Sequence, residues 1–188
     1  MRSVIVSRTE TAEPGETALV AKLRAGEPAA VGDAFDRYNS RLFGFVLRMS
    51  GNRQTAEDMV QETFVRLAKS GPRLREDTDL RAWLFTVARN LLRSHRRWAA
   101  VDADRLEILA EAPRPIQATA HDQLAEREAA KRLEVAISRL ADKYREIILL
   151  VGVQQMSPAE AASVIGTTPA AARKRLSRAR ALLRKELE

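Results

Sequence analysis

The sequence predicts an all-α protein: two small helical domains joined by a flexible linker, the second containing a helix-turn-helix. Apolar residues recur every three or four positions in two separate parts of the chain, which is the period of an amphipathic helix. Between these parts, residues 99–122 have no such period. Near the end of the chain, two helix-start signals flank a glycine, as in two helices joined by a tight turn. No strand or hairpin signal accompanies them.

Four helices are expected in the first domain, which we place at residues 17–98, after a flexible tail at residues 1–16. Their predicted ranges are 17–25, 28–50, 53–69 and 80–97, with breaks at Gly26, Gly51 and Gly71-Pro72. The second helix carries a predicted buried face that consists of Val31, Phe35, Tyr38, Leu42, Phe45 and Met49.

The third helix has two chemically different sides. We expect it to start near a capping pattern formed by Thr55 and Asp58. Its predicted inner face consists of Ala56, Val60, Phe64 and Leu67. Its other side carries Glu57, Asp58, Gln61 and Glu62, which periodicity alone describes as an ordinary solvated surface.

Arginines gather toward the end of the fourth helix, which Asp79 is expected to cap. Its apolar stripe is predicted to contain Leu80, Leu84, Val87 and Leu91. The polar residues that follow are Arg89, Asn90, Arg93, Ser94, Arg96 and Arg97. The helix dipole favours cations at this end. Four arginines exceed what the dipole requires, so we predict a phosphate-facing surface here.

The linker at residues 99–122 is acidic and contains Pro113 and Pro115. After it we expect the second domain at residues 123–188, beginning with helices at 123–140 and 142–151. Their predicted inward residues are Leu133, Ile137, Leu140, Ile147, Ile148 and Val151.

The helix-turn-helix occupies residues 157–188. Ser157 is an expected N-cap, Pro158 fits the first helical position, and Glu160 completes a capping box. Gly166 can adopt the left-handed conformation that ends the first helix, and Thr168-Pro169 starts the second.

The second of these helices has an apolar stripe of Ala172, Leu176, Ala179 and Leu183. Basic residues lie largely outside it, namely Arg173, Lys174, Arg178 and Arg180. Charge alone more often indicates a solvated face. Together with the caps and the glycine turn, however, it predicts a helix that enters the major groove of DNA.

Composition sets further limits. A net charge of +7 over 188 residues favours a polyanionic partner such as nucleic acid. The chain has no cysteine, and His95 and His121 do not form a ligand-spaced pair, so we expect no metal, no cofactor and no enzymatic activity. No stretch has the apolar length of a signal peptide or membrane span, so we expect a cytoplasmic protein.

Three segments resemble the extracytoplasmic-function sigma factors, bacterial subunits that direct RNA polymerase to promoters. They are AEDMVQETFVRL at residues 56–67, LRAWLFTVARN at residues 80–90, and YREIILL at residues 144–150, which leads into the helix-turn-helix. Their order, with a variable linker between the second and third, makes the resemblance specific. It implies an alternative sigma factor that binds core RNA polymerase, selects promoters and helps open their −10 region.

The resemblance also implies a role for each surface. Core polymerase would dock, through the clamp helices of its largest subunit, on Asp58, Gln61 and Glu62. The −10 element would be handled by the 73–78 loop, with Arg73 and Arg75, and by the fourth helix. In that helix Asn90 and Ser94 would reach bases, while Arg89, Arg93, Arg96 and Arg97 would hold the DNA backbone.

The last helix would read the −35 element through Arg173, Lys174, Arg175, Ser177, Arg178 and Arg180. The acidic linker would follow the polymerase channel that RNA later occupies, and an anti-sigma factor would be a partner.

Two other classes of protein fit part of the sequence. A self-sufficient helix-turn-helix regulator would also need a ligand pocket or a dimer seam, and the first domain gives no sign of either. A metal-dependent nuclease could use Asp58 and Glu62, but no third carboxylate and no candidate base accompany them.

Overall fold

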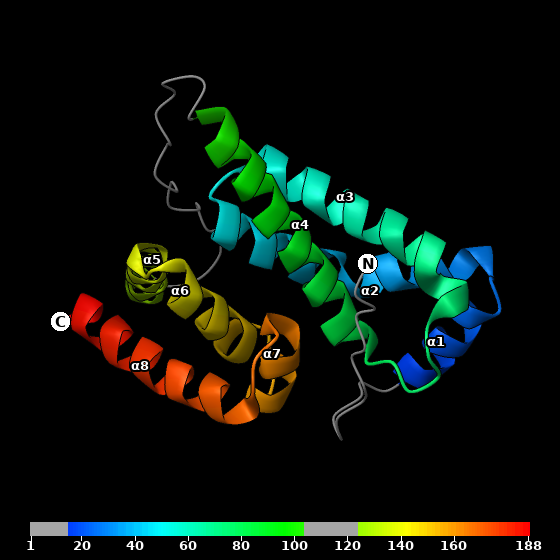
Figure 1. Cartoon of the computed structure of the whole chain (residues 1–188). Coiled ribbons are helices and arrows are strands. Elements are labelled where there is room, and N and C mark those ends of the chain that lie inside the picture. The colour runs from blue at the N-terminus through cyan, green and yellow to red at the C-terminus, as the bar shows by residue number, and fades with distance from the viewer. Residues whose placement is uncertain (1–14, 104–123) are drawn as a thin grey trace.

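The computed structural model describes residues 15–103 and 124–188, and every regular element within these ranges is helical (Figure 1). The first domain contains α1 (Glu16–Arg24), α2 (Pro28–Ser50), α3 (Arg53–Ser70), the short 3-10 turn η1 (Gly71–Arg73) and α4 (Leu80–Ala103). The second contains α5 (Leu124–Arg139), α6 (Asp142–Ile148), the π-helical turn η2 (Leu149–Val153), α7 (Pro158–Ile165) and α8 (Pro169–Leu187). The predicted fold class, all-α with two helical domains, is confirmed.

Two predicted segments fall largely outside the described residues. The tail predicted at residues 1–16 is described only from Gly15 onward, and most of the linker predicted at residues 99–122, with Pro113 and Pro115, lies in the range 104–123. The helix α4 continues to Ala103 rather than ending at Arg97. Residues 98–103 contain neither glycine nor proline, so nothing in the local sequence stops the helix there.

The start of α3 differs from the prediction. Asn52 caps the helix, because its side-chain oxygen accepts a hydrogen bond from the Thr55 backbone N–H at 2.9 Å. The predicted capping pair of Thr55 and Asp58 is therefore wrong. The Asp58 carboxylate instead accepts a hydrogen bond from the Gln54 side chain at 3.1 Å.

The core of the first domain lies between α2, α3 and α4. There the rings of Phe45 and Phe85 pack edge to face, with their centroids 5.3 Å apart. Glu16, at the start of α1, is buried and joins three helices. Its carboxylate accepts a hydrogen bond from the Tyr38 hydroxyl at 2.9 Å and another from the Leu80 backbone N–H at 2.8 Å. A residue that the sequence assigned to the tail thus fixes α1 against α2 and α4.

Two residues predicted to be buried are exposed. Phe35 is 42% exposed, because the first half of α2 buries Ala30 and Ala34 instead. Leu133 on α5 is 40% exposed, while Ala136 and Ile137 face the core. In both helices the apolar stripe in the sequence is wider than the face that neighbouring helices cover.

The second domain is built around the predicted helix-turn-helix. The capping box of Ser157 and Glu160 is present, Gly166 ends α7 with a φ of 68°, and the Thr168 side chain accepts a hydrogen bond from the Ala171 N–H. Arg145 on α6 is buried and donates hydrogen bonds to the carbonyls of Ile137, Ser138 and Leu140, so it satisfies the end of α5.

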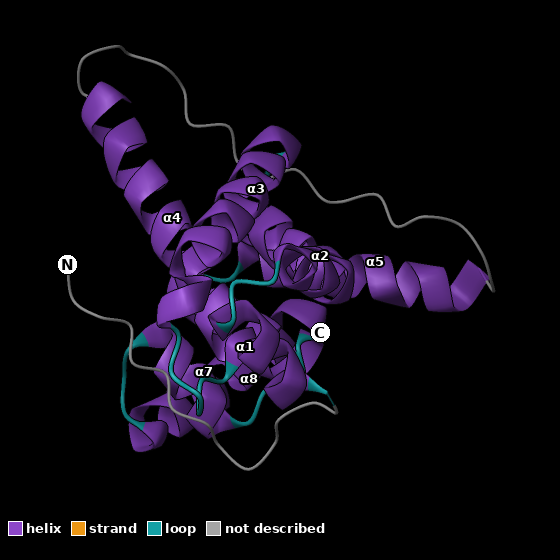
Figure 2. Cartoon of the chain, turned by 90° about the vertical axis from the view of Figure 1, so that its right-hand side faces the viewer, coloured by secondary structure: helices purple, strands orange, loops and turns teal. Residues whose placement is uncertain are grey.

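The two domains pack against each other, with α4 lying on α7 and α2 on α6 (Figure 1). Every residue from Thr78 to Ala88 is buried, since the first half of α4 has α2 and α3 on one side and α7 on the other. Only the end of α4 extends away from the other helices, as the turned view shows (Figure 2).

Candidate functional site

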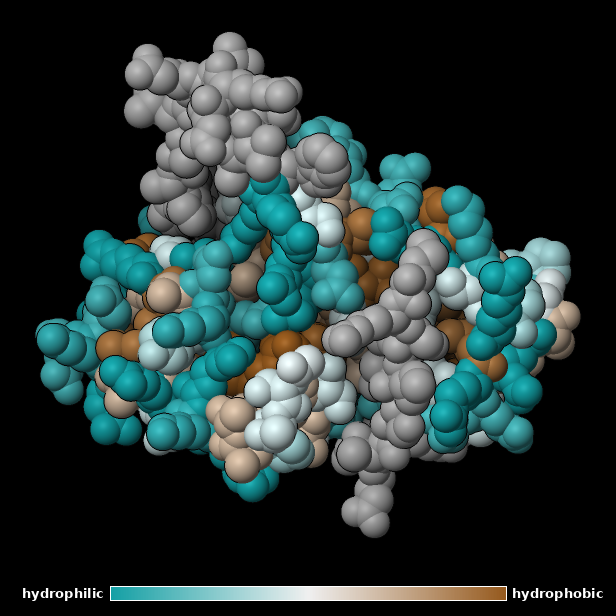
Figure 3. All heavy atoms as spheres, viewed as in Figure 1, coloured by the Kyte–Doolittle hydropathy of each residue, from teal (hydrophilic) through white to brown (hydrophobic). Residues whose placement is uncertain are grey.

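The basic side of α8 faces solvent. Ala172, Leu176 and Ala179 are buried against the rest of the second domain, as predicted. Of the predicted DNA-reading residues, Arg175 is half-buried, and the exposed ones are Arg173, Lys174, Ser177, Arg178 and Arg180. The surface over α8 is mostly hydrophilic in the space-filling view (Figure 3). One straight helix therefore presents several cations along a single accessible side, which suits a polyanionic groove.

The 73–78 loop joins η1 to α4 and carries two exposed arginines, Arg73 and Arg75. The Arg75 guanidinium donates two hydrogen bonds to the Asp77 carboxylate, at 2.8 and 2.9 Å. These bonds lower the pKa of Asp77 below its ordinary value. Because the pair is exposed, it adds little stability, and another anion can replace Asp77 at small cost.

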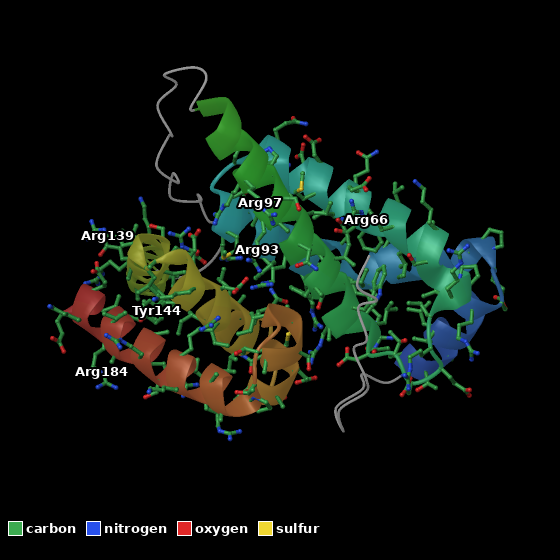
Figure 4. All side chains as sticks on the ribbon, in the orientation of Figure 1. Arg66, Arg93, Arg97, Arg139, Tyr144 and Arg184 are labelled. Carbon is green, nitrogen blue, oxygen red and sulfur yellow. The ribbon has the colours of Figure 1, made fainter. Side chains whose placement is uncertain are left out.

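The arginine-rich part of α4 divides into two sets. Asn90, Arg93, Ser94 and Arg97 are exposed on the second half of the helix, where Figure 4 shows Arg93 and Arg97 one turn apart. The other two predicted DNA contacts, Arg89 and Arg96, face the second domain. Arg89 is only 12% exposed, and its Nε donates to Glu146 Oε1 at 2.5 Å. Arg96 donates to the Asp142 carboxylate and to the Met49 carbonyl. In this conformation the four arginines do not share one exposed surface, and their role as DNA contacts stays a prediction.

The acidic side of α3 borders an apolar groove. Asp58 and Gln61 are exposed, and Glu62 is half-buried and forms an ion pair with Arg66 at 2.8 Å. The groove, of about 700 Å³, lies between α2 and α3, and Gln61 is among the residues that line it. Its apolar lining comes from Val31, Phe35, Phe43, Val60, Phe64 and Val65. Sequence reasoning missed this groove, because a half-exposed aromatic residue has the same helical spacing as a buried one.

Sequence reasoning also missed the ion pairs between the domains. Arg81 Nη2 lies 2.7 Å from Glu160 Oε1, and Arg48 Nη2 lies 2.7 Å from Glu134 Oε1. Burial alone would raise the pKa of Glu160, but hydrogen bonds from Ser157 and the nearby Arg81 lower it below its ordinary value. The partners are 79 and 86 residues apart in the chain, and no local pattern marks such pairs.

Neither a metal site nor a membrane span is found in the part of the chain that the structure describes. No three histidine, aspartate or glutamate side chains come together there in a metal-binding arrangement. No described helix is both long enough and apolar enough to cross a bilayer.

The fold and the basic α8 define a two-domain helix-turn-helix protein, and comparison with known proteins identifies its family. Sigma-70 region 2 matches residues 34–100, and Sigma-70, region 4 matches residues 130–183. The ECF RNA polymerase sigma factor EcfG of Rhodopseudomonas palustris (strain TIE-1) is 35% identical over 145 residues, which cover 76% of each chain. The ECF RNA polymerase sigma factor BldN of Streptomyces coelicolor is 32% identical over 79% of this chain and 56% of its own length.

A solved structure agrees. The sigma factor RpoE in complex with the anti-sigma factor NepR, from Bartonella quintana, superposes with a TM-score of 0.71 and 26% identity, covering 85% of this chain and 97% of that one. The chain belongs to the extracytoplasmic-function RNA polymerase sigma factors, which are transcription initiation factors and not classical enzymes. This family, rather than the self-sufficient regulator, accounts for the first domain as well as the second.

Proposed function

We propose that this sigma factor acts in the cytoplasm, where it docks on core RNA polymerase through α3, reads the −35 element with α8, and captures the opened −10 region with α4 and the 73–78 loop. The observation that supports this proposal best is that three separate surfaces, one acidic and two basic, lie on different helices of one chain. An acidic face beside an apolar groove lies on α3, and two basic surfaces lie on α4 and α8.

Docking on α3 combines apolar and charged contacts. The groove offers exposed apolar area that a partner helix can cover, and such patches on a folded protein mark interaction sites. Asp58, Gln61 and Glu62 stand at or beside this groove and would set the orientation of a basic partner surface through charge complementarity. The clamp helices of the largest polymerase subunit are the partner we propose.

Promoter recognition divides between double-stranded and opened DNA. The side chains of α8, from Arg173 to Arg180, would contact base edges and phosphates in the major groove of the −35 duplex. Asn90 and Ser94 would contact bases of the −10 strand, with arginines of α4 and of the 73–78 loop on its backbone. Flipping one base out of the stack costs a few kcal/mol, so capture of the single strand must supply about that much.

We also propose that an anti-sigma factor binds this chain and covers its polymerase-docking surface. The supporting observation is the structural similarity to an RpoE that was solved in complex with the anti-sigma factor NepR.

Transcription in vitro with core polymerase on a genomic DNA library, followed by sequencing of the transcripts, tests the function and identifies the promoters. The docking surface is tested by a double variant, Asp58→Arg with Glu62→Arg. We expect it to keep its helical circular dichroism but to lose polymerase binding, because reversing charges at an interface costs several kcal/mol.

The matched control is Glu186→Arg with Glu188→Arg, which makes the same change in net charge at the exposed end of α8. We expect this control to bind polymerase as the wild type does. A docking variant that folds normally and binds polymerase with undiminished affinity would rule out α3 as the docking surface.

A further inference from the structure

The helix α1 lies outside the part of the chain that matches Sigma-70 region 2, which begins at residue 34. It packs on α2 and on η1, the short turn that leads into the 73–78 loop (Figure 1). In the proposed function this loop takes part in capturing the opened −10 strand. The contacts of α1 therefore bear on a segment that we propose binds DNA.

The first residue of α1, Glu16, holds the start of α4. Its Oε1 accepts a hydrogen bond from the Leu80 backbone N–H at 2.8 Å, and its Oε2 accepts one from the Tyr38 hydroxyl at 2.9 Å. Leu80 is the first residue of α4, and an N–H at this position has no acceptor inside its own helix. Glu16 therefore supplies that acceptor from 64 residues earlier in the chain, and Tyr38 ties the same carboxylate to α2.

The other end of α1 holds the beginning of the same segment. A Cβ atom on Gly71 would lie 3.1 Å from the Leu23 carbonyl oxygen, so η1 lies directly against the last turn of α1. Beside this contact, the Arg24 guanidinium lies 3.6 Å from the Glu76 carboxylate, in an exposed pair that adds little stability by itself. The two ends of α1 therefore contact the two ends of residues 71–80.

Between these two attachment points the 73–78 loop has buried anchors and an exposed basic tip. Leu74 and Thr78 are buried, whereas Arg73 and Arg75 are exposed. The Thr78 backbone N–H donates to the Arg75 carbonyl at 3.1 Å and closes a turn at the tip. Binding residues are commonly carried by loops that a rigid scaffold positions. A loop that is already ordered also loses less conformational freedom when it binds, so it binds more tightly and more selectively.

We propose that Glu16 is a positioning residue for −10 recognition: its hydrogen bonds to Leu80 and Tyr38 fix the 73–78 loop in the conformation that captures the opened strand. Glu16 is 3% exposed, so it acts through the loop and not by contact with DNA. This inference rests on the proposed role of the loop in DNA binding.

The test measures how well the polymerase holoenzyme discriminates between two single-stranded oligonucleotides. One carries the −10 sequence identified by sequencing the transcripts, the other has the same bases in scrambled order, and each has its own dye. Both compete for the same holoenzyme, so the ratio of the two complexes does not depend on the fraction of active molecules. A variant that is only less stable forms less of both complexes and keeps the ratio of the wild type.

Three variants of α1 are compared. Glu16→Ala removes both hydrogen bonds, and we expect it to lower the ratio about tenfold because the loop must then be ordered on binding. Glu16→Gln keeps an oxygen that can accept from the Leu80 N–H and gains an amide that can donate to the Tyr38 hydroxyl, so we expect a ratio within about twofold of the wild type. The control is Val20→Ala, which removes buried methyl groups from α1 and leaves Glu16 in place. We expect it to be less stable but to keep the ratio unchanged.

If Glu16→Ala fails to fold, as judged by circular dichroism, Tyr38→Phe takes its place, because it loses only the hydroxyl that donates to Glu16. We expect this milder change to lower the ratio about threefold. If the variant that folds has the same ratio as Val20→Ala, Glu16 belongs only to the core of the domain and the inference is wrong. It is equally wrong if Glu16→Gln loses as much discrimination as Glu16→Ala.

The wild type separates this inference from the proposed function. If its holoenzyme does not prefer the −10 oligonucleotide to the scrambled one, the proposed capture of the opened strand fails. If it does prefer the −10 oligonucleotide and the variants of Glu16 and Tyr38 keep that preference, the capture stands and the positioning role of Glu16 is excluded.

Discussion

Glu16, Asp79 and Glu160 are three buried carboxylates near the start of α4, with exposed fractions of 3%, 6% and 2%. Glu16 accepts hydrogen bonds from Tyr38 and Leu80, and Glu160 pairs with Arg81. Burial raises the pKa of Asp79 above its ordinary value, and the charges of Glu16 and Glu160 raise it further, although the Ala82 N–H partly offsets both. Asp79 is therefore a helix cap that carries an unfavourable charge.

This leads to a prediction for Asp79→Asn. Asparagine caps a helix about as well as aspartate, and the substitution removes the charge, so we expect the free energy of unfolding at neutral pH to stay equal or rise. The matched variant Asp79→Ala loses the bond to Ala82 and should be about 1 kcal/mol less stable than Asp79→Asn. Chemical denaturation followed by circular dichroism measures both.

The pH dependence has a definite sign. The pKa of Asp79 is higher in the folded chain than in the unfolded chain. The stability that Asp79 contributes is therefore fully present below its pKa in the unfolded chain, and it is lost as pH rises through its pKa in the folded chain. The advantage of Asp79→Asn should therefore be largest at neutral pH and shrink as pH falls toward the ordinary aspartate range. An advantage that grows on acidification would contradict this account.

At the scale of single residues, the sequence predicts correctly those interactions whose partners lie within a few positions of each other in the chain. Ser157, Glu160 and Thr168 act as the caps their spacing predicts, because capping involves atoms within one helical turn. Burial was less predictable. Phe35 and Leu133 have the right period, but their exposure depends on how far the neighbouring helices reach.

At the scale of helices, α8 is expected to read bases through particular side chains. We predict that Arg178→Ala weakens binding of the polymerase holoenzyme to duplex promoters by roughly 1–3 kcal/mol, because a base contact is lost. The exposed Arg184, near the end of the same helix, provides the control Arg184→Ala, which should have a much smaller effect. Binding is measured over a range of potassium chloride concentrations on several promoters. An equal loss on every promoter, with a salt slope lower by about one, would indicate a phosphate contact and contradict base reading by Arg178.

Helix ranges were mostly predictable, because glycine and proline interrupt the periodic segments at Gly26, Gly51 and Gly166. The π-helical turn at Leu149–Val153 was not predictable. Such a turn inserts one extra residue into a helix, and the single glycine within it, Gly152, does not distinguish it from an ordinary helix end.

At the scale of the whole molecule, the sequence indicated two helical domains and the exposed basic side of α8, but not how the domains pack. The contact between them depends on pairs such as Arg89–Glu146, whose members are 57 residues apart and belong to separately periodic segments. The same contact explains why the predicted −10 surface is incomplete in this conformation. A list of arginines on one helix does not reveal which of them already have a carboxylate partner.

In the proposed function, α8 binds the −35 duplex and α4 binds opened DNA of the −10 region. The most direct test is the yield of abortive transcripts from holoenzymes carrying Arg173→Ala or Asn90→Ala, on duplex, pre-melted and upstream-truncated promoters. We predict that Asn90→Ala lowers the yield on the duplex and on the pre-melted template, while Arg173→Ala lowers it only where the −35 duplex is present. If Arg173→Ala impairs the truncated template as severely as the full promoter, α8 is not the −35 reader and the division of labour is wrong.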